Sequence, residues 1–366
     1  MKFVSSALAL VASLLSPALI AKTPVDALQL PPGFVVEVLV EDLDNARAMA
    51  IADDGTVFVG TRDAGNVYAL ELDDNEVNAR HTIASGLRMP TGLAYRDGSL
   101  YVAAISQILR FDDISGSLRS PPKPVIVTDN LPTERHHGWK HIAFGPDGWL
   151  YVPIGAPCNV CDAGKPYASI YRMRADGSEI ELVAAGVRNS VGFDWNPADD
   201  SLWFSDNGRD MMGDDIPPCE LNRVSKAGEH FGFPYCHGSN VSDPEFGERQ
   251  ACSASTAPAV EFGAHTAPLG VHFYRGEQFP ERYRKGTFVA QHGSWNRSKK
   301  IGYQVLWVPI TGKQAGEPEV FLSGFLDGET TLGRPVDFAE MADGSLLVSD
   351  DFADAIYRIR YVGVAN

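Results

Sequence analysis

The stretch IAFGPDGWLYVPIG, residues 142–155, holds two short runs of largely apolar residues on either side of a Gly-Pro-Asp-Gly turn. An Asp-Gly pair between alternating strands is a strong hairpin signal, because glycine tolerates the positive φ that a tight turn demands. The same strand, turn and strand recur as AMAIADDGTVFVGTRDAGNVYAL from Ala48, GLAYRDGSLYVAAISQILRF from Gly92, GFDWNPADDSLWFSDNG from Gly192 and DFAEMADGSLLVSDDFADAIYRI from Asp337. A less regular copy, RYRKGTFVAQHGSWNRSKKIGYQVLWVP, begins at Arg282.

Six copies of one hairpin unit, mostly spaced by roughly 40 to 60 residues, are typical of a β-propeller. Helical periodicity is almost absent, and 24 prolines and 35 glycines punctuate strands. We therefore predict an all-β fold, a six-bladed β-propeller, as a single domain over residues 22–366. The strand FVVEVLVEDL from Phe34 should pair beside IYRIRYV in the last blade and close the ring, which removes exposed sheet edges.

The interval from Asp210 to about Pro268 displaces the fifth copy of the unit. It carries several prolines, a cluster of acids and three of the five cysteines, including Cys236 and Cys252. We expect an elaborated loop over about residues 210–268, lying above the propeller and not forming a separate domain. Loops at one end of a propeller channel commonly build the functional site.

The first residues, MKFVSSALALVASLLSPALIAK, combine a lysine, an apolar run and small residues near Ala21. This pattern predicts a signal peptide over residues 1–21 and a periplasmic or secreted protein. No segment approaches the ~20 apolar residues of a membrane span. The net charge of −16, with 47 acidic against 31 basic residues, disfavours a nucleic-acid partner.

All five cysteines lie between Cys158 and Cys252. In an oxidising compartment Cys158 and Cys161 would close a small loop and Cys236 would pair with Cys252, which leaves Cys219 unpaired. A metal or redox CxxC is the competing interpretation. It is weaker, because the chain has no second CxxC for zinc and no histidine after the first to attach a c-type haem.

The run His136-His137-Gly138-Trp139-Lys140-His141 precedes the third unit, at the lip of its hairpin. Histidine exchanges a proton near neutral pH, so the cluster suits general-base catalysis. Neighbouring loop histidines are also often plain solvated residues. The functional interpretation gains weight from three further polar segments at equivalent blade positions: GVRNSVGFDWNP before the fourth unit, SDNGRDMMGDDIPPCELN after its strand, and LGRPVDF before the last unit.

Together these segments offer histidines, Arg188, Arg334, Asn189 and a Gly-flanked acidic loop. Arginine binds carboxylates through its planar fork, and backbone carbonyls around residues 207–209 would suit a hard cation such as calcium. The set favours a polyanionic, metal-assisted ligand. The alternative is that each arginine is a surface ion-pair partner and the acidic loop is merely solvated.

The longest phrases of the chain resemble the L-sorbosone dehydrogenase branch of the soluble pyrroloquinoline-quinone (PQQ) sugar dehydrogenases. The resemblance covers essentially the whole chain after the predicted signal peptide. It is carried by HHGWKHIAFGPDGWLYVPIGAPCNVC, GVRNSVGFDWNP, DNGRDMMGDD with ELNR, HFGFPYCHG and QHGSWNRS.

This resemblance implies a six-bladed propeller in which PQQ lies over the channel mouth with a calcium ion. His137 matches the base that removes the substrate proton while a hydride passes to the quinone. Arg188 and Asn189 match the residues that bind the quinone oxygens, and Arg334 matches the arginine that holds a PQQ carboxylate. The calcium loop matches Gly208 and Arg209, through their carbonyls.

The chain departs from its glucose-oxidising relatives at three places. Ala156 stands where they have an acidic residue, and Val336 stands where they carry a second arginine. Their cofactor-binding lysine falls in the QHGSWNRSKK loop, where either Arg297 or Lys299 would substitute. The resemblance therefore implies a sugar or aldehyde substrate without naming glucose.

Two other classes of function fit the same architecture. Six-bladed propellers include calcium-dependent lactonases and esterases, and also non-catalytic extracellular binding modules. The arginines favour an anionic cofactor over the carboxylate-lined metal site of such a hydrolase. For the dehydrogenase, a separate electron acceptor is expected, because no haem domain is apparent; the sequence leaves the oligomeric state open.

Overall fold

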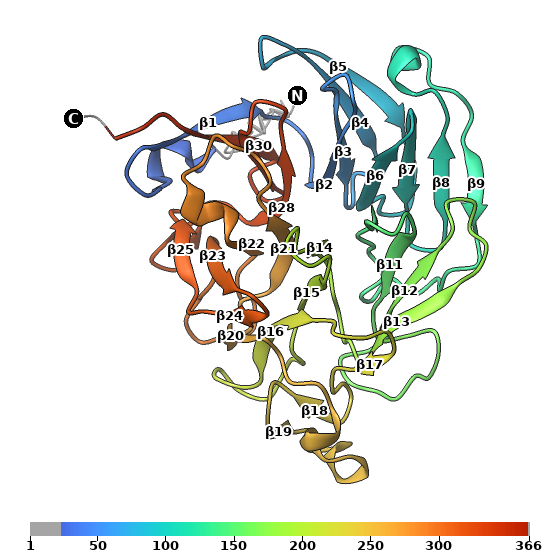
Figure 1. Cartoon of the computed structure of the whole chain (residues 1–366), viewed down its shortest axis with the longest axis vertical. Coiled ribbons are helices and arrows are strands. Elements are labelled where there is room, and N and C mark those ends of the chain that lie inside the picture. The colour runs from blue at the N-terminus through green and yellow to red at the C-terminus, as the bar shows by residue number, and fades with distance from the viewer. Residues whose placement is uncertain (1–22, 365–366) are drawn as a thin grey trace, which may run out of the picture.

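The computed structural model describes residues 23–364, and the predicted signal peptide lies outside this range. Six antiparallel sheets are arranged around a central axis as a six-bladed β-propeller (Figure 1), which confirms the predicted fold. The first three blades comprise β2 (Ala46–Ile51), β3 (Val57–Thr61), β4 (Val67–Asp73) and β5 (Glu76–Ala84); β6 (Gly92–Arg96), β7 (Ser99–Ala103), β8 (Ile108–Phe111) and β9 (Val125–Thr128); and β10 (Ala143–Phe144), β11 (Leu150–Ile154), β12 (Ser169–Met173) and β13 (Glu181–Ala185).

The remaining blades follow the same order from the axis outward. They comprise β14 (Phe193–Trp195), β15 (Leu202–Asp206), β16 (Pro218–Arg223) and β20 (Val260–Ala264); β21 (Pro268–Phe273), β22 (Gly286–Gln291), β23 (Gln304–Thr311) and β25 (Glu319–Leu322); and β28 (Pro335–Glu340), β29 (Leu346–Asp350), β30 (Ala355–Tyr361) and β1 (Phe34–Val40). The helices of the described residues are short 3-10 turns, and none of them is long and apolar enough to cross a membrane.

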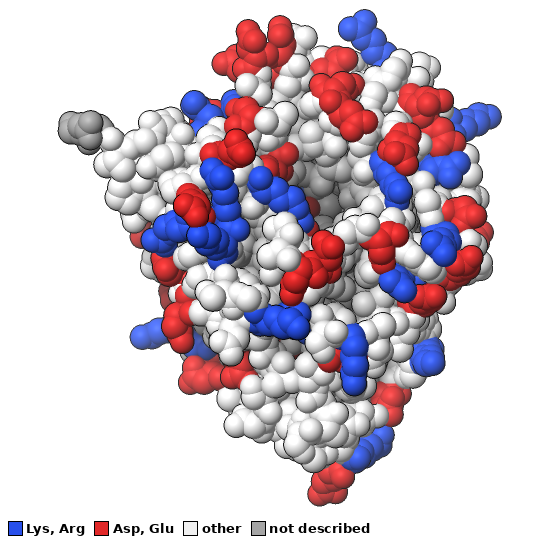
Figure 2. Space-filling model, viewed as in Figure 1, with Lys and Arg blue, Asp and Glu red and all other residues white. Residues whose placement is uncertain are grey.

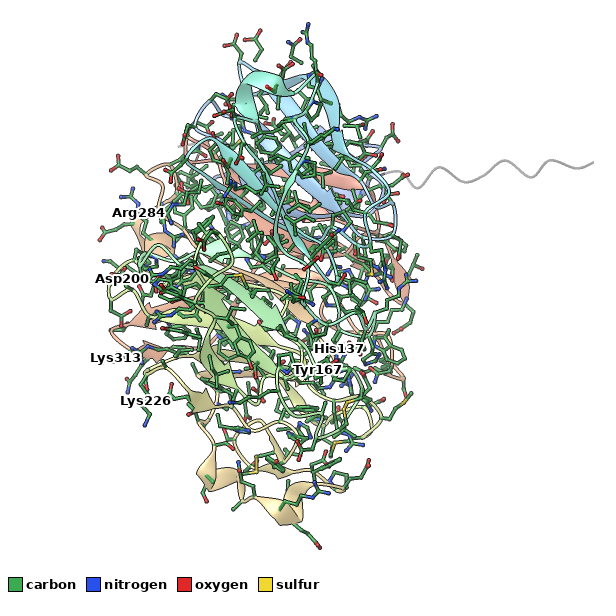
Figure 3. All side chains as sticks on the ribbon, turned by 90° about the vertical axis from the view of Figure 1, so that its right-hand side faces the viewer. His137, Tyr167, Asp200, Lys226, Arg284 and Lys313 are labelled. Atoms are coloured by element: carbon green, nitrogen blue, oxygen red, sulfur yellow. A yellow bond between two sulfur atoms is a disulfide. The ribbon has the colours of Figure 1, made fainter. Side chains whose placement is uncertain are left out.

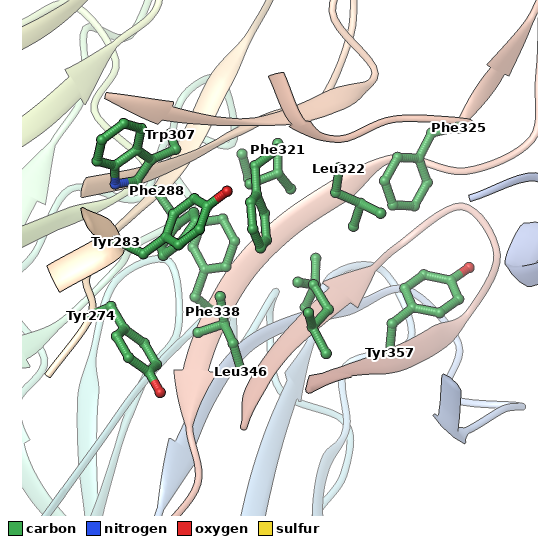
Figure 4. Packing of buried hydrophobic residues seen from close by; sticks show 14 of the residues in the cluster. Tyr274, Tyr283, Phe288, Trp307, Phe321, Leu322, Phe325, Phe338, Leu346 and Tyr357 are labelled. Carbon is green, nitrogen blue, oxygen red and sulfur yellow. The ribbon is translucent and has the colours of Figure 1, made fainter. Parts of the chain in front are cut away.

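The first strand closes the ring, as predicted. Strand β1 pairs antiparallel with β30, from Phe34 opposite Tyr361 to Val40 opposite Ile356. The Phe34 ring lies edge-on to the rings of four aromatic residues at centroid distances of 4.8 to 5.3 Å: Phe279, Tyr283, Phe321 and Tyr361. Figure 4 shows part of this aromatic cluster between the last two blades, which buries much of the apolar surface that stabilises the closure.

Blades are joined near the axis by close backbone approach and serine hydroxyls. A Cβ at Gly192 would lie 2.2 Å from the Leu269 carbonyl oxygen, so only glycine fits where β14 meets β21. Ser205 Oγ donates to that same carbonyl at 2.6 Å. Ser349 Oγ donates equivalently to the Arg47 carbonyl at 2.7 Å, joining the last blade to the first. These contacts hold the strand ends, and the residues beside them, in fixed positions.

The structure differs from the prediction at two places in the second half of the chain. The interval 210–268 is not one loop, because it contains β16 and β20, the outer strands of the fourth blade. The fifth blade begins with β21, which precedes the copy of the unit that was predicted to begin at Arg282. Strands β16, β20 and β21 were missed for the same reason: none of the three is followed or preceded by an Asp-Gly turn.

The insertion proper lies between β16 and β20. Its strand β17 (Glu229–His230) adds parallel to β13, and β18 (Cys236–His237) forms a small hairpin with β19 (Val241–Ser242). The predicted disulfides Cys158–Cys161 and Cys236–Cys252 are both present, and Cys219 is free and buried on β16. On the face shown in Figure 2, basic and acidic side chains are interspersed around a hollow near the centre of the ring.

Candidate functional site

A cavity of about 300 Å³ opens at one end of the propeller axis. Figure 3 shows His137 on the opposite side of the molecule from Asp200, Lys226 and Lys313. The cavity is lined by Arg47, Arg62, His136, His137, Trp139, Arg188, Asn189, Asn207, Gly208, Asp210, Cys219, His265, Ala267, Leu269, His292, Trp295, Asn296 and Arg334.

The topology explains why these residues meet. The innermost strands all begin at the cavity end, so residues just before β10, β14 and β28 reach it. The second strands run the other way and end there, so residues just after β3, β15 and β22 reach it too. The first, fourth and fifth blades offer both positions to the cavity, and the third and last blades offer the position before the innermost strand, so the four predicted polar segments converge there.

His137 is held in a single orientation. Its backbone has a φ of +48°, and its side chain is buried. Nδ1 lies 2.9 Å from the Ala156 carbonyl oxygen, which can only accept, so Nδ1 carries the proton and Nε2 keeps its lone pair. Burial, followed by the positive charge of Arg188, lowers the pKa of His137 well below 6.5. The imidazole is therefore neutral at pH 7.

Arg188 is 3% exposed, and protein acceptors hold all five N–H groups of its guanidinium. Nε donates to the Asn159 carbonyl at 2.8 Å, and Nη1 donates to the carbonyls of Asn207 and Gly208 at 3.0 and 2.9 Å. Nη2 donates to Asn159 Oδ1 at 2.8 Å and to Asp210 Oδ2 at 3.1 Å. Burial lowers the pKa of Arg188, and Asp210 and Asp206 oppose that shift.

Two buried carboxyl groups, those of Asp206 and Glu220, lie on the neighbouring strands β15 and β16. Asp206 accepts the backbone N–H groups of Arg188 and Asn189 at 2.8 and 2.6 Å, and it stands opposite Glu220 across β15 and β16. Burial raises the pKa of Asp206 to about 7. Burial, with repulsion from Asp206, raises the pKa of Glu220 to about 8. The pair thus holds a proton near neutral pH.

Another side of the cavity is lined by Arg47, His292 and Arg334, and the ionised carboxylate of Asp351 binds the first two of these residues. Asp351 bonds Arg47 Nη1 at 2.8 Å and His292 Nε2 at 2.6 Å. Burial opposes ionisation, but His292 and Arg47 outweigh it and lower the pKa of Asp351 well below its usual range. Burial lowers the pKa of His292 to about 4, so this ring is neutral and donates to Asp351. Arg334 donates to the carbonyls of His292 and Gly293 at 2.9 and 2.7 Å.

Two polar atoms of the cavity lining are left without partners. Among the described residues, Trp139 Nε1 and Asn296 Oδ1 are buried and make no hydrogen bond. Buried polar groups in proteins are normally paired, so an unpaired donor and acceptor beside a cavity point to a bound group that satisfies them. Among residues 23–364, no three His, Cys, Asp or Glu side chains are grouped to hold a metal ion.

A family model described as TrAA12-like matches residues 28–360. This chain belongs to the TrAA12-like family. The predicted relationship to the PQQ-dependent sugar dehydrogenases is thereby confirmed, and the sorbosone branch stays a prediction. The TrAA12-like chain is 36% identical over 349 residues to an uncharacterized protein of Borreliella burgdorferi, covering 91% of each.

Other relatives of this TrAA12-like chain carry more informative names. The PQQ-dependent pyranose dehydrogenase of Coprinopsis cinerea is 31% identical over 132 residues, which are 30% of this chain and 17% of that protein. The holo PQQ domain of that enzyme superposes with a TM-score of 0.76 at 18% identity, covering 91% of this chain and 97% of the domain. The calcium structure of the Trichoderma reesei family AA12 protein also gives 0.76, at 19% identity, covering 93% and 98%.

The cavity of the TrAA12-like chain collects most of the predicted site residues: His137, Arg188, Asn189, Gly208 and Arg334. The other predicted residues do not line it.

The predicted residues Arg209, Arg297 and Lys299 lie outside the cavity lining. Arg297 bonds the Asp214 carbonyl and Asp215, and Lys299 is not among the lining residues. The side chain of Arg209 turns away to Asp243 at 2.5 Å and to Glu245 at 2.9 Å.

Sequence reasoning missed Arg47, Arg62 and His292, which line the cavity, and Asn159, which holds Arg188. A signal existed for two of them. Arg62 and His292 directly follow β3 and β22, the position at which Asn207 follows β15. Reading every blade at that position would have found both residues.

Proposed function

We propose that this chain is a PQQ-dependent dehydrogenase that oxidises a sugar or a sugar-derived aldehyde of the sorbosone or aldose type. The observation that carries this proposal is a single cavity that pairs a neutral histidine, with its Nε2 lone pair free, with four arginines. Support comes from the family and from the relative named a PQQ-dependent pyranose dehydrogenase.

The lining residues fit PQQ, a flat aromatic molecule with three carboxylates. Arg47, Arg62 and Arg334 would face its negative charge, as guanidinium groups do for carboxylates. The unpaired Trp139 Nε1 and Asn296 Oδ1 would find partners on a polar ligand in the cavity. In this protein Arg47 and Arg62 would take the part that the resemblance gave to Arg297 or Lys299.

Calcium would be held by main-chain oxygen atoms, the donor type that this hard cation prefers. The carbonyls of Asn207 and Gly208 lie at the cavity and already accept from Arg188 Nη1. A carbonyl oxygen has two lone pairs, so the ion would share these acceptors with the guanidinium. The Asp210 carboxylate beside them would offset part of the added positive charge.

When bound, PQQ would supply the hydride acceptor of the reaction. His137 Nε2 would take the proton of the substrate hydroxyl or hydrate, a role that contributes about 10²- to 10⁴-fold in enzymes. The Ala156 carbonyl fixes the tautomer that this step needs. Arg188, whose side chain is buried, would place a fixed positive charge beside the oxygen on which negative charge develops.

We further propose that the protein acts in the periplasm or outside the cell and passes electrons to a separate carrier. Both disulfides suit an oxidising compartment. The predicted signal peptide adds support from the sequence.

The test is reconstitution of the purified protein with PQQ and calcium, followed by dye reduction with aldoses, sorbosone and simple aldehydes. We expect dye reduction that requires PQQ and falls when a chelator removes calcium. A protein that shows no PQQ-dependent spectral change and no turnover would overturn the proposal. Hydrolysis of lactones by the same preparation would favour the propeller lactonase alternative.

A further inference from the structure

The loop after β11 carries the Cys158–Cys161 disulfide, and Asn159 lies between its two cysteines. Asn159 makes four hydrogen bonds, all to the site. Its carbonyl and its Oδ1 accept from Arg188 Nε and Nη2, each at 2.8 Å. Its Oδ1 also accepts the Asp210 N–H at 2.8 Å, and its Nδ2 donates to the Asp210 carbonyl at 3.0 Å. One residue of the third blade thus bonds two segments of the fourth.

These bonds decide how Arg188 is held. Asn159 takes two of its five N–H groups directly, and it fixes the backbone of Asp210, whose carboxylate takes a third. A buried guanidinium that loses its acceptors pays a large desolvation cost, so it would turn to other partners. The orientation of Arg188 therefore depends on Asn159 more than on any other residue.

The disulfide makes this support rigid. A bridge between residues three apart restricts the backbone of the residues that it encloses. The Asn159 carbonyl, which takes Arg188 Nε, belongs to that restricted backbone. Without the bridge, the loop would have more conformations available, and holding Asn159 against Arg188 would cost more conformational entropy.

We propose that Asn159, held by the Cys158–Cys161 disulfide, is a positioning residue that sets the orientation of Arg188 at the PQQ site. The proposal rests on the proposed function for the role of Arg188, but the geometry stands without it. An amide suits the position because it accepts from a cation and donates to a carbonyl. Aspartate would keep the acceptor, lose the donor and add a charge beside Asp210.

The geometric test is nuclear magnetic resonance of protein labelled with [¹⁵N]arginine, without any cofactor. We expect a slowly exchanging Arg188 Nε–H signal, assigned by its loss in Arg188→Lys. Asn159→Ala should speed its exchange, while the neighbouring Val160→Ala should leave it unchanged. An Arg188 signal that is unaltered in Asn159→Ala would overturn the inference, whatever the protein binds.

The functional test is a double-mutant cycle read out by PQQ titration and by kcat and KM. We expect Asn159→Ala to weaken PQQ binding or lower kcat by roughly tenfold, and Asn159→Asp to recover part of the loss. In the Arg188→Lys background the same alanine change should have little further effect, because Asn159 acts through Arg188. Equal losses in both backgrounds would show a merely structural role.

The disulfide is tested by replacing Cys158 and Cys161 together with serine. We expect the same direction of change in the Arg188 signal, and a smaller loss of PQQ affinity. The matched control replaces Cys236 and Cys252, whose side chains do not line the cavity. If both double variants leave the signal unchanged, the bridge has no part in positioning. A parent protein that binds no PQQ would remove the proposed function and leave the signal test standing.

Discussion

The two walls of the cavity use histidine in different ways. On the wall of the third and fourth blades, His137 bonds a main-chain carbonyl and keeps Nε2 free. On the wall of the last two blades and the first, His292 donates to Asp351, which also binds Arg47. Both rings are neutral because burial lowers their pKa values, but the hydrogen-bond partner of His137 is a neutral main-chain carbonyl, whereas that of His292 is a buried carboxylate.

The buried carboxyl groups on the two sides of the cavity differ in the direction in which their pKa values are shifted. Asp206 and Glu220 face each other without a cationic side chain bonded to either one, so burial raises their pKa values. Asp351 has two donors and is ionised. The comparison indicates that one wall is built for proton and charge changes and the other for holding fixed charge.

The largest effect should come from His137→Ala. We expect turnover to fall by roughly 10²- to 10⁴-fold while PQQ affinity stays close to that of the parent, because His137 is proposed to move a proton and not to hold the cofactor. Steady-state kinetics and PQQ titration measure the two quantities. If the variant kept its turnover, His137 would not be the base, and His292 would be the next residue to replace.

Asp351→Asn should act mainly on stability. Removing the charge leaves Arg47 buried without a carboxylate, so we expect a loss of about 3–5 kcal/mol in the free energy of unfolding. Denaturant unfolding measures it. Asp147→Asn, at the half-exposed pair with Arg172, is the control and should cost about 1 kcal/mol or less. Similar losses at both sites would contradict the view of Asp351 as the anchor of its wall.

Arg334→Ala should weaken PQQ binding by roughly 10- to 100-fold, the usual scale for a lost hydrogen bond to a charged group. Arg297→Ala should bind PQQ like the parent, because Arg297 is engaged with the loop of Asp214 and Asp215. Equilibrium titration of the two variants compares them directly. The reverse ranking would restore Arg297 to the site and remove Arg334 from it.

The smallest effect concerns pH and Glu220. Its pKa is about 8 in the folded protein against an ordinary 4.5, so the folded state binds more protons between these values, and stability is lost as pH rises through that window. Glu220→Gln should reduce this loss, a change of roughly one to a few degrees in Tm between pH 5 and pH 9. Asn222, whose Oδ1 is unpaired, would accept from the new amide. If the Tm of Glu220→Gln and that of the parent fell equally between pH 5 and pH 9, the raised pKa of Glu220 would be contradicted.

The fold was predictable where a blade contains an Asp-Gly turn, as at Asp147 and Gly148. Strands β16, β20 and β21 carry no such turn and were not recognised. The ring closure was predictable because Phe34 begins a strand that has no partner in its own unit.

The site was predictable where a residue precedes an innermost strand, as Arg188 and Arg334 do. It was missed where a residue follows a second strand, as His292 does. The role of Asn159 was beyond the sequence, because it depends on the directions of backbone carbonyls in two blades. A CxxC pattern indicates a bridge, but not which side chain the bridge presents.

Ring closure by β1 and β30 also constrains the order in which the protein can fold. Phe34 pairs with Tyr361, so the earliest described strand of the chain must wait for the latest one. Such long-range pairing slows folding, and until it occurs one sheet edge is open to other chains. A chain cut before Ala355 would be left with β1 unpaired, and its last blade would be a template for aggregation.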